Sequence, residues 1–301
     1  MPLTTLRTDL RGDGVVLTAD RWEPASPRKG IVLLLHGGGQ TRHSWQRTGI
    51  RLADNGWCAL AIDARGHGDS EWAEDGDYGT EAHARDLAAV VTDLGEPPVL
   101  VGASMGGMAS LLAQGDHGIG RALVLVDITP RAEPEGLAKI TAFMESGLAG
   151  FDTLDDALDA VVAYNPHRRR PPRIEGLRKN LRHRDGRWYW HWDPRMIMHR
   201  ENGVDQAGVR EARARAAARA VTVPTLLIRG AQSDVVSADG ARDLLELIPA
   251  ARHIDVGGAG HMVSGDDNDL LSDGLLDFLD REVAYTRKVT TTRYDSPHHA
   301  K

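Results

Sequence analysis

The strongest constraint on the fold is a glycine-rich turn between an apolar run and a helix-compatible stretch. The apolar run covers residues 99–101, and Gly-Ala-Ser-Met-Gly follows at residues 102–106. Glycine at both positions flanking the serine removes side chains that would collide where a strand turns sharply into a helix. Such a turn lifts the Ser104 hydroxyl above the sheet, at a helix N-terminus that favours an oxyanion. This G-x-S-x-G pattern predicts a nucleophilic serine; the alternative is a loop whose serine merely caps the helix.

Length and composition bound the remaining possibilities. With 301 residues the chain can form one large α/β domain with a substantial core. The formal charge of −7 argues against a general nucleic-acid binder. The single cysteine, Cys58, lies in an apolar run and predicts a buried thiol. No apolar run approaches the roughly 18–20 residues of a membrane span, and the N-terminus lacks the apolar core of a signal peptide, so we expect a cytoplasmic protein.

Apolar runs and turn residues predict eight strands. Most are separated by helix-sized segments, which requires crossover connections and hence a mostly parallel sheet. The first two strands flank Gly-Asp-Gly at residues 12–14 and predict an antiparallel ribbon. The expected strands cover residues 3–10, 15–22, 30–35, 57–62, 99–101, 122–128, 225–228 and 253–256, and the expected helices 44–55, 78–94, 104–114, 238–248 and 269–283.

Residues 131–221 break this alternation. They contain no convincing buried strand, but helix-like segments cover residues 135–148, 154–164, 174–182 and 204–220. An insertion of this length after the sixth strand predicts a helical cap over the carboxyl ends of the strands, where ligand sites form in α/β sheets. We therefore expect an α/β core over residues 1–130 and 222–301, with the cap over 131–221.

A serine nucleophile needs a base and an acid that orients it. The best base is His261, which follows the last strand in a Gly-Gly-Ala-Gly-His turn and suits the chain order serine, acid, histidine. Two acids compete. Asp127 ends the sixth strand, whereas Asp234 lies in the loop after the seventh. In that loop an aspartate often stands three residues after the glycine that ends the strand. Counted from Gly230, that position is Ser233, and Asp234 lies one residue further on. Asp127 is slightly favoured, and an arrangement in which Ser233 and Asp127 both support the histidine stays open.

The oxyanion of an acyl-transfer reaction needs two main-chain N–H donors beside the serine. The first is expected from Met105, the residue after the nucleophile. The second is expected from Gly38, with Gly39 as the alternative, in the His-Gly-Gly-Gly loop at residues 36–39 that directly follows a buried strand. We expect the other residues of this loop, His36, Gly37 and Gly39, to contact the substrate.

Taken together, the motifs at residues 35–39, 63–70, 102–107, 127–130 and 258–262 resemble the α/β-hydrolase superfamily, in particular its capped, esterase-like branch. The resemblance covers about residues 1–130 and 222–285. It implies that the Asp-Ala-Arg-Gly-His-Gly-Asp-Ser segment at 63–70 is mainly structural, so Asp63 and His67 receive no catalytic role. It also implies acyl transfer, because epoxide hydrolases and haloalkane dehalogenases carry aspartate where Ser104 stands.

The most unusual stretch is Arg-Trp-Tyr-Trp-His-Trp at residues 187–192. If it is extended, Trp188, Trp190 and Trp192 share one face and could line an apolar substrate pocket above Ser104. Alternatively, they form the cap's own small core. The chain shows no metal-binding spacing and no convincing nucleotide fingerprint, so we expect neither a metal nor another cofactor.

These features predict a serine hydrolase that cleaves small to medium, fairly apolar carboxylic esters. Lactone or carbon–carbon bond hydrolysis on the same triad is the alternative, and a non-catalytic ligand-binding protein of the same fold is a remote one. The expected partner is a small-molecule ester or acyl substrate. We expect no nucleic-acid or membrane partner, and a monomer or homodimer.

Overall fold

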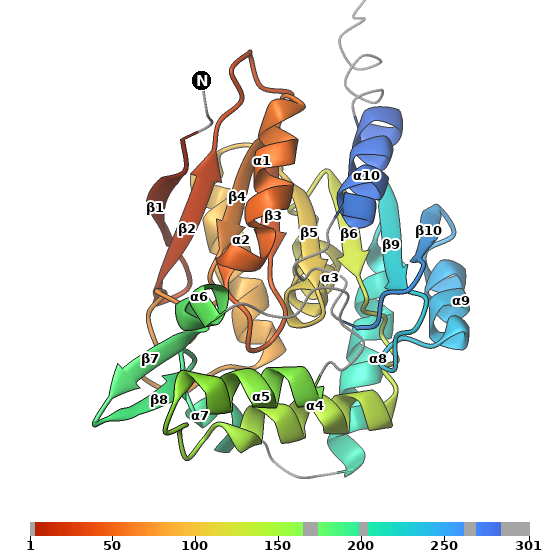
Figure 1. Cartoon of the computed structure of the whole chain (residues 1–301). Coiled ribbons are helices and arrows are strands. Elements are labelled where there is room, and N and C mark those ends of the chain that lie inside the picture. The colour runs from red at the N-terminus through yellow and green to blue at the C-terminus, as the bar shows by residue number, and fades with distance from the viewer. Residues whose placement is uncertain (1–3, 165–173, 199–203, 262–268, 284–301) are drawn as a thin grey trace, which may run out of the picture.

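The computed structural model describes residues 4–164, 174–198, 204–261 and 269–283 (Figure 1). These residues form a large twisted sheet, helices on both of its faces, and a smaller layer across one end of the sheet. None of the helices in these ranges is both long and apolar enough to span a membrane.

The sheet has eight strands in the order β1-β2-β4-β3-β5-β6-β9-β10. β2 pairs antiparallel with both β1 and β4, whereas all other neighbours are parallel. The predicted eight-stranded, mostly parallel sheet with an N-terminal antiparallel ribbon is therefore confirmed. The strands are β1 (Leu6–Arg11), β2 (Val16–Trp22), β3 (Ile31–Leu35), β4 (Cys58–Ile62), β5 (Val99–Ala103), β6 (Ala122–Val126), β9 (Thr225–Gly230) and β10 (Ala251–Val256).

The central strands are continuous apolar runs because both of their faces are covered. Every residue of β3, β4, β5 and β6 is buried, and alternate side chains enter two separate hydrophobic clusters. In β3, for example, Leu33 and Leu35 belong to one cluster, and Val32 and Leu34 to the other. The sheet therefore carries a hydrophobic core on each side, and its carboxyl edge is left for the site.

Helices cover both faces of the sheet (Figure 1). On one face lie α1 (Gln46–Asp54) and α10 (Asp269–Phe278), which continues in a π-helical turn, η3 (Leu279–Val283). On the other face lie α2 (Thr80–Leu94), α3 (Met105–His117), α8 (Val204–Ala220) and α9 (Ala238–Leu247). The helices predicted in the core match these to within a few residues, and α8 has the predicted bounds 204–220 although it was predicted as part of the cap.

Helix α8 lies in the core, although the predicted cap boundary at residue 221 placed it in the cap. Its alanines Ala214, Ala217 and Ala218 belong to the same hydrophobic cluster as the central strands. The helix lies so close to α3 that a Cβ atom added at Gly115 would be 2.6 Å from the Ala217 carbonyl oxygen. Small residues permit this approach, but they give a weak apolar pattern among arginines, so the sequence did not reveal the buried face.

The described segments between β6 and α8 cross the end of the sheet at which β6 and β9 finish (Figure 1). This region also contains a β-hairpin, so the helix predicted over 174–182 continues only to residue 180. The two hairpin strands are mostly exposed or half-buried, so they are not the buried strand whose absence from this region was predicted. The hairpin turns at Asp185 and Gly186, whose φ angles of 50° and 77° suit the tight two-residue turn that Asp-Gly favours. The elements are α4 (Pro134–Ser146), α5 (Leu154–Tyr164), α6 (Ile174–Leu177), the 3-10 helix η2 (Arg178–Asn180), β7 (Leu181–Arg184), β8 (Arg187–Trp190) and α7 (Arg195–Met198).

Candidate active site

Ser104 occupies the sharp turn between β5 and α3. Its φ of 44° and ψ of −112° place it in a region that residues with a side chain rarely adopt. A Cβ atom at Gly102 would overlap the Gly106 carbonyl, and one at Gly106 would lie 2.7 Å from the His36 carbonyl oxygen. The two glycines of the motif are therefore required by the packing of the turn, and the strain at Ser104 is held by the strand and helix on either side.

Asp127 is the carboxylate that contacts His261. The distance between Asp127 Oδ2 and His261 Nδ1 is 2.7 Å, and both side chains are buried. The same carboxylate accepts hydrogen bonds from the Ser233 hydroxyl (2.6 Å) and from the Gly230 N–H (2.8 Å). Asp127 has a φ of 49°, which turns its side chain from the end of β6 toward these three donors. The carboxylate is thereby fixed in one orientation.

Asp234, the competing acid, is exposed at the surface. Its carboxylate forms an ion pair with Lys139 of α4 at 2.9 Å. The intervening hydroxyl of Ser233 donates to Asp127 and accepts from the N–H groups of Val235 and Val236. Ser233 therefore supports the acid rather than the histidine. Within the described residues no hydrogen bond joins Ser104 to His261, a contact that often tightens only when substrate binds.

The loop after β3 lies directly against the serine turn. A Cβ atom at Gly37 would be 3.4 Å from the Ser104 Cβ, and one at Gly38 would be 4.0 Å from the Met105 Sδ. The Gly37 N–H donates to the Gln40 side chain (3.0 Å) and the Gly39 N–H donates to His67 Nε2 (3.2 Å). In the part of the chain that the structure describes, the N–H groups of Gly38 and Met105 have no hydrogen-bond acceptor. Both were predicted as oxyanion donors.

Three buried histidines surround this loop. His36 Nδ1 lies 2.8 Å from the Gly37 carbonyl oxygen, and its Nε2 accepts from the Ala64 N–H (3.0 Å). The ring centroid of His67 is 5.0 Å from that of His36 and 5.7 Å from that of His191. Because both ring nitrogens of His36 are engaged by the main chain, the imidazole supports the loop and is not free for the substrate contact predicted for it. His191, a residue of the cap, was not expected here.

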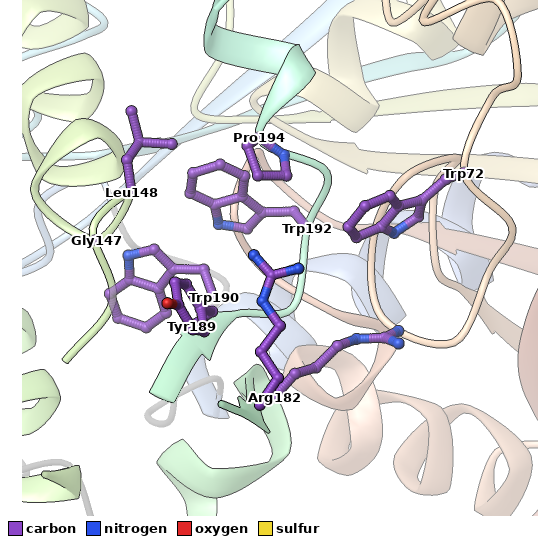
Figure 2. A pocket seen from close by; sticks show the side chains of 9 residues that line it. Trp72, Gly147, Leu148, Arg182, Tyr189, Trp190, Trp192 and Pro194 are labelled. Carbon is purple, nitrogen blue, oxygen red and sulfur yellow. The ribbon is translucent and has the colours of Figure 1, made fainter. Parts of the chain in front are cut away.

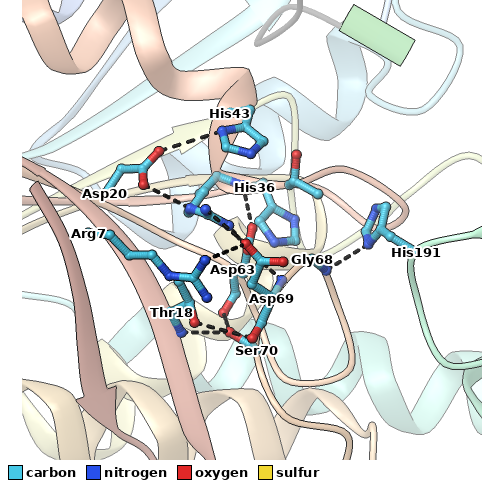
Figure 3. A network of polar contacts seen from close by, with 12 residues as sticks. Arg7, Thr18, Asp20, His36, His43, Asp63, Gly68, Asp69, Ser70 and His191 are labelled. Carbon is cyan, nitrogen blue, oxygen red and sulfur yellow. Dashed lines mark hydrogen bonds and ion pairs between the residues drawn. The ribbon is translucent and has the colours of Figure 1, made fainter. Parts of the chain in front are cut away.

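Asp63 anchors the neighbouring segment 63–70 (Figure 3). Its carboxylate accepts from the N–H groups of Arg42 (2.6 Å) and Asp69 (2.9 Å) and pairs with the Arg42 guanidinium. Arg42 opens the 3-10 helix η1 (Arg42–Trp45) and also pairs with Asp20 (2.9 Å). The main-chain carbonyl of Asp63 accepts from the Ser70 hydroxyl at 2.6 Å. These contacts give the segment a structural role.

The three tryptophans of residues 187–192 lie in different places. Trp188 is partly buried against the cap core, and Trp190 packs within it with its ring centroid 5.2 Å from that of Phe151. Trp192 reaches the oxyanion loop, because a Cβ atom at Gly39 would lie 3.8 Å from its Nε1. Only Trp192 therefore lies beside the loop at the predicted substrate site.

Trp192 also lines a small pocket (Figure 2). Ser104 and His261 are not among the described residues that line it, so this pocket is separate from the reacting groups. Its lining residues are Trp72, Gly147, Leu148, Arg182, Arg184, Tyr189, Trp190, Trp192 and Pro194.

The strained serine, the histidine and the aspartate lie at the carboxyl edge of the sheet. The sequence also matches a known family. The family model described as alpha/beta hydrolase fold matches residues 30–267. The chain belongs to the α/β-hydrolase family. The hydrolase is 33% identical over 263 residues to esterase Rv0045c of Mycobacterium tuberculosis, which spans 83% of this chain and 82% of that protein. It is 28% identical over 254 residues to 2-(acetamidomethylene)succinate hydrolase of Mesorhizobium japonicum, spanning 83% and 88%.

Solved structures give the same fold. The crystal structure of E-2-(acetamidomethylene)succinate hydrolase superposes with a TM-score of 0.77 at 23% identity, covering 92% of the hydrolase and all of that chain. The crystal structure of esterase Rv0045c from Mycobacterium tuberculosis superposes with a TM-score of 0.70 at 28% identity and covers 92% of each chain. Both superpositions cover more than nine-tenths of this chain.

We expect the hydrolase to lose stability as the pH falls from about 8 to about 5. Burial holds the pKa of His83 and of His191 at about 3. Between this value and the ordinary pKa of about 6.5, the unfolded chain binds protons that the folded chain does not, so the free energy of unfolding decreases as the pH falls. At pH 5 each of these histidines should remove about 2 kcal/mol relative to pH 8, and urea unfolding at several pH values measures the loss.

His83 offers a control for this pH dependence. It lies on α2, and within the described residues its buried Nε2 has no hydrogen-bond partner. The variant His83→Gln carries no titrating group at this position, so its unfolding free energy should depend less steeply on pH. Identical slopes in the variant and the wild type would contradict the assignment of a neutral buried His83.

Proposed function

We propose that this hydrolase is a serine esterase that cleaves carboxylic esters of small to medium, fairly apolar substrates through an acyl-enzyme on Ser104. The observation that carries the proposal is the 2.7 Å contact between Asp127 and His261 at the same sheet edge as the strained serine turn. Similarity to a protein named an esterase, over more than four-fifths of both chains, supports this reaction type.

In the proposed mechanism the Ser104 oxygen attacks the ester carbonyl carbon, and His261 Nε2 takes the hydroxyl proton. Asp127 accepts a hydrogen bond from Nδ1–H of His261, which leaves Nε2 free as the base and stabilises the imidazolium. The tetrahedral intermediate collapses as the alcohol leaves with the proton held on His261. Water then attacks the acyl-enzyme, His261 takes its proton, and that proton returns to Ser104 as the acid is released.

The oxyanion of each tetrahedral intermediate would be bound by the N–H groups of Gly38 and Met105. Both lack another acceptor among the described residues, whereas the N–H groups of Gly37 and Gly39 are engaged elsewhere. Met105 also opens helix α3, whose dipole favours negative charge at this point. The proposed donors are therefore those that need no other bond to be broken.

The cap would supply the surface that selects the substrate. We propose that it spans residues 131–203 and the core the remainder, since α8 packs in the core. Trp192 and Met144 lie beside Gly39, where a Cβ atom would be 3.8 Å and 3.9 Å from them. An indole and a thioether next to the oxyanion loop favour an apolar group close to the scissile bond.

A fluorophosphonate probe tests the proposed nucleophile. The wild type should gain the mass of one phosphonyl group, located on the peptide that contains Ser104, whereas Ser104→Ala should gain none. Ser146→Ala, which removes an exposed serine of α4, is the matched control and should label like the wild type. A folded wild type that stays unlabelled would exclude a serine-esterase mechanism.

Hydrolysis of a substrate panel tests the reaction. Nitrophenyl esters of increasing acyl length, lactones and amides should be compared by kcat/KM. The proposal predicts that medium-length apolar esters are the best substrates. A preference of tenfold or more for lactones or amides would replace the esterase assignment by another acyl transfer on the same serine.

A further inference from the structure

His191 connects the cap to the loop proposed to bind the oxyanion. It follows β8 and is buried between the cap and the carboxyl edge of the sheet. Its Nδ1 lies 2.6 Å from the Gly68 nitrogen, and its Nε2 lies 3.3 Å from the Gly39 carbonyl oxygen. Since the Gly68 N–H can only donate, Nδ1 is the acceptor and the ring proton resides on Nε2. The imidazole therefore donates to Gly39 (Figure 3 shows its contact with Gly68).

Gly39 is held on both sides. Its N–H donates to His67 Nε2 at 3.2 Å, and its carbonyl accepts from His191. With a φ of 74°, Gly39 has a left-handed conformation that only glycine adopts without cost, so its two peptide groups need external support to keep their directions. His67 and His191 supply that support from the core and from the cap, respectively.

The adjacent peptide group carries the proposed oxyanion donor. The Gly38 N–H belongs to the same planar unit as the Gly37 carbonyl, which lies 2.8 Å from His36 Nδ1 and accepts from the Gln40 N–H at 3.1 Å. The direction of the Gly38 N–H thus depends on a short loop pinned at Gly37 by His36 and at Gly39 by His67 and His191. Of these three histidines, only His191 comes from the cap.

We propose that His191 is a positioning residue for catalysis: its Nε2–H, by binding the Gly39 carbonyl, holds the Gly38 N–H in the direction that binds the oxyanion. This inference rests on the proposed esterase function. It makes the cap part of the reaction as well as of substrate selection, because the oxyanion hole is fully ordered only when the cap segment at His191 is seated on the loop. A purely structural role would be carried by the Gly68 contact alone.

Two amide variants separate the two contacts. The amide nitrogen of glutamine reaches the position of Nε2, so His191→Gln keeps a donor for Gly39 and loses the acceptor for Gly68. Asparagine is shorter and places its amide oxygen near Nδ1, so His191→Asn keeps the Gly68 contact and loses the donor. We expect kcat to fall about 10- to 100-fold in the asparagine variant with little change in KM, since the lost interaction acts in the transition state. The glutamine variant should retain kcat to within a few-fold.

A transition-state analogue supplies the second readout. A trifluoromethyl ketone forms a hemiketal on Ser104 and uses the oxyanion donors, so its inhibition constant should weaken in His191→Asn by the same factor as kcat/KM. The inhibition constant of the corresponding alcohol, which uses no oxyanion donor, should stay within about twofold. Equal losses of kcat in both amide variants, or a change in KM alone, would overturn the positioning role.

These experiments also distinguish failure of the positioning role of His191 from failure of the proposed esterase function. If the wild type is not labelled at Ser104, the esterase proposal fails. If the wild type is labelled and hydrolyses esters while both His191 variants match it, the esterase proposal stands and the positioning role is rejected. Active-site titration with the fluorophosphonate gives kcat per folded site in each variant, so a loss of folded protein does not imitate either result.

Discussion

Replacing Ser104 by alanine or by glycine should lower kcat for ester hydrolysis by about 10⁶-fold, because either change removes the nucleophile. The two variants should differ in stability. At a φ of 44° and ψ of −112° a Cβ atom is strained, and only glycine relieves this strain. We expect the unfolding free energy of Ser104→Gly to exceed that of Ser104→Ala by about 1–2 kcal/mol, as measured by urea unfolding at neutral pH.

The comparison between the two variants controls for the lost hydroxyl, since both lack it. Glycine in an ordinary helix-start position would be the less stable of the pair, because it loses more backbone entropy on folding. An alanine variant at least as stable as the glycine variant would therefore show that the turn holds Ser104 without appreciable strain. Residual ester hydrolysis above about 1% of the wild-type rate in either variant would contradict the role of Ser104 itself.

Replacing Asp127 by asparagine should lower kcat by about 10³- to 10⁴-fold, and replacing Asp234 by asparagine should change it by less than about twofold. The Asp127 carboxylate lies 2.7 Å from His261 Nδ1 and keeps the ring proton there, whereas an amide NH₂ at this position favours the opposite tautomer and blocks Nε2 as the base. Steady-state rates with one nitrophenyl ester measure both effects.

The variants Asp127→Asn and Asp234→Asn are well matched for this comparison. Asparagine tolerates the φ of 49° at residue 127, so the substitution leaves the backbone conformation accessible. Asp234 follows the next strand of the sheet and also bears a charge partner, Lys139, but contacts no reacting group. A larger loss from Asp234→Asn than from Asp127→Asn would show that the acid is recruited from the other loop during the reaction.

The sheet and the serine turn could be predicted from sequence because their determinants are local. Fully buried strands appear as unbroken apolar runs, and the turn at Ser104 requires glycine at two fixed positions beside it. The position of His261 could be predicted for the same reason, since it ends a glycine-rich turn directly after the last strand. In each case neighbouring residues in the chain determine the conformation.

The remaining features depend on contacts between distant residues. Asp127 and Asp234 both follow strands that end at one edge of the sheet, and only the backbone turn at Asp127 decides which carboxylate reaches His261. His191 finds its partners 123 and 152 residues away, at Gly68 and Gly39. The hairpin at residues 181–190 could have been predicted from local sequence, because Asp-Gly at residues 185–186 is typical of a two-residue hairpin turn. The aromatic pattern around it was interpreted without that turn signal.

The placement of α8 limits how the specificity of this scaffold can be changed. A chimaera that exchanges residues 131–221 for the insert of another hydrolase would remove α8. This helix packs against α3 where Gly115 and Ala217 meet. An exchange that stops before Val204 keeps the contact between α8 and α3 and replaces only the elements between β6 and α8. We therefore expect residues 131–203, proposed above as the cap, to be exchangeable up to the start of α8, provided that the inserted segment supplies a side chain that binds the Gly39 carbonyl.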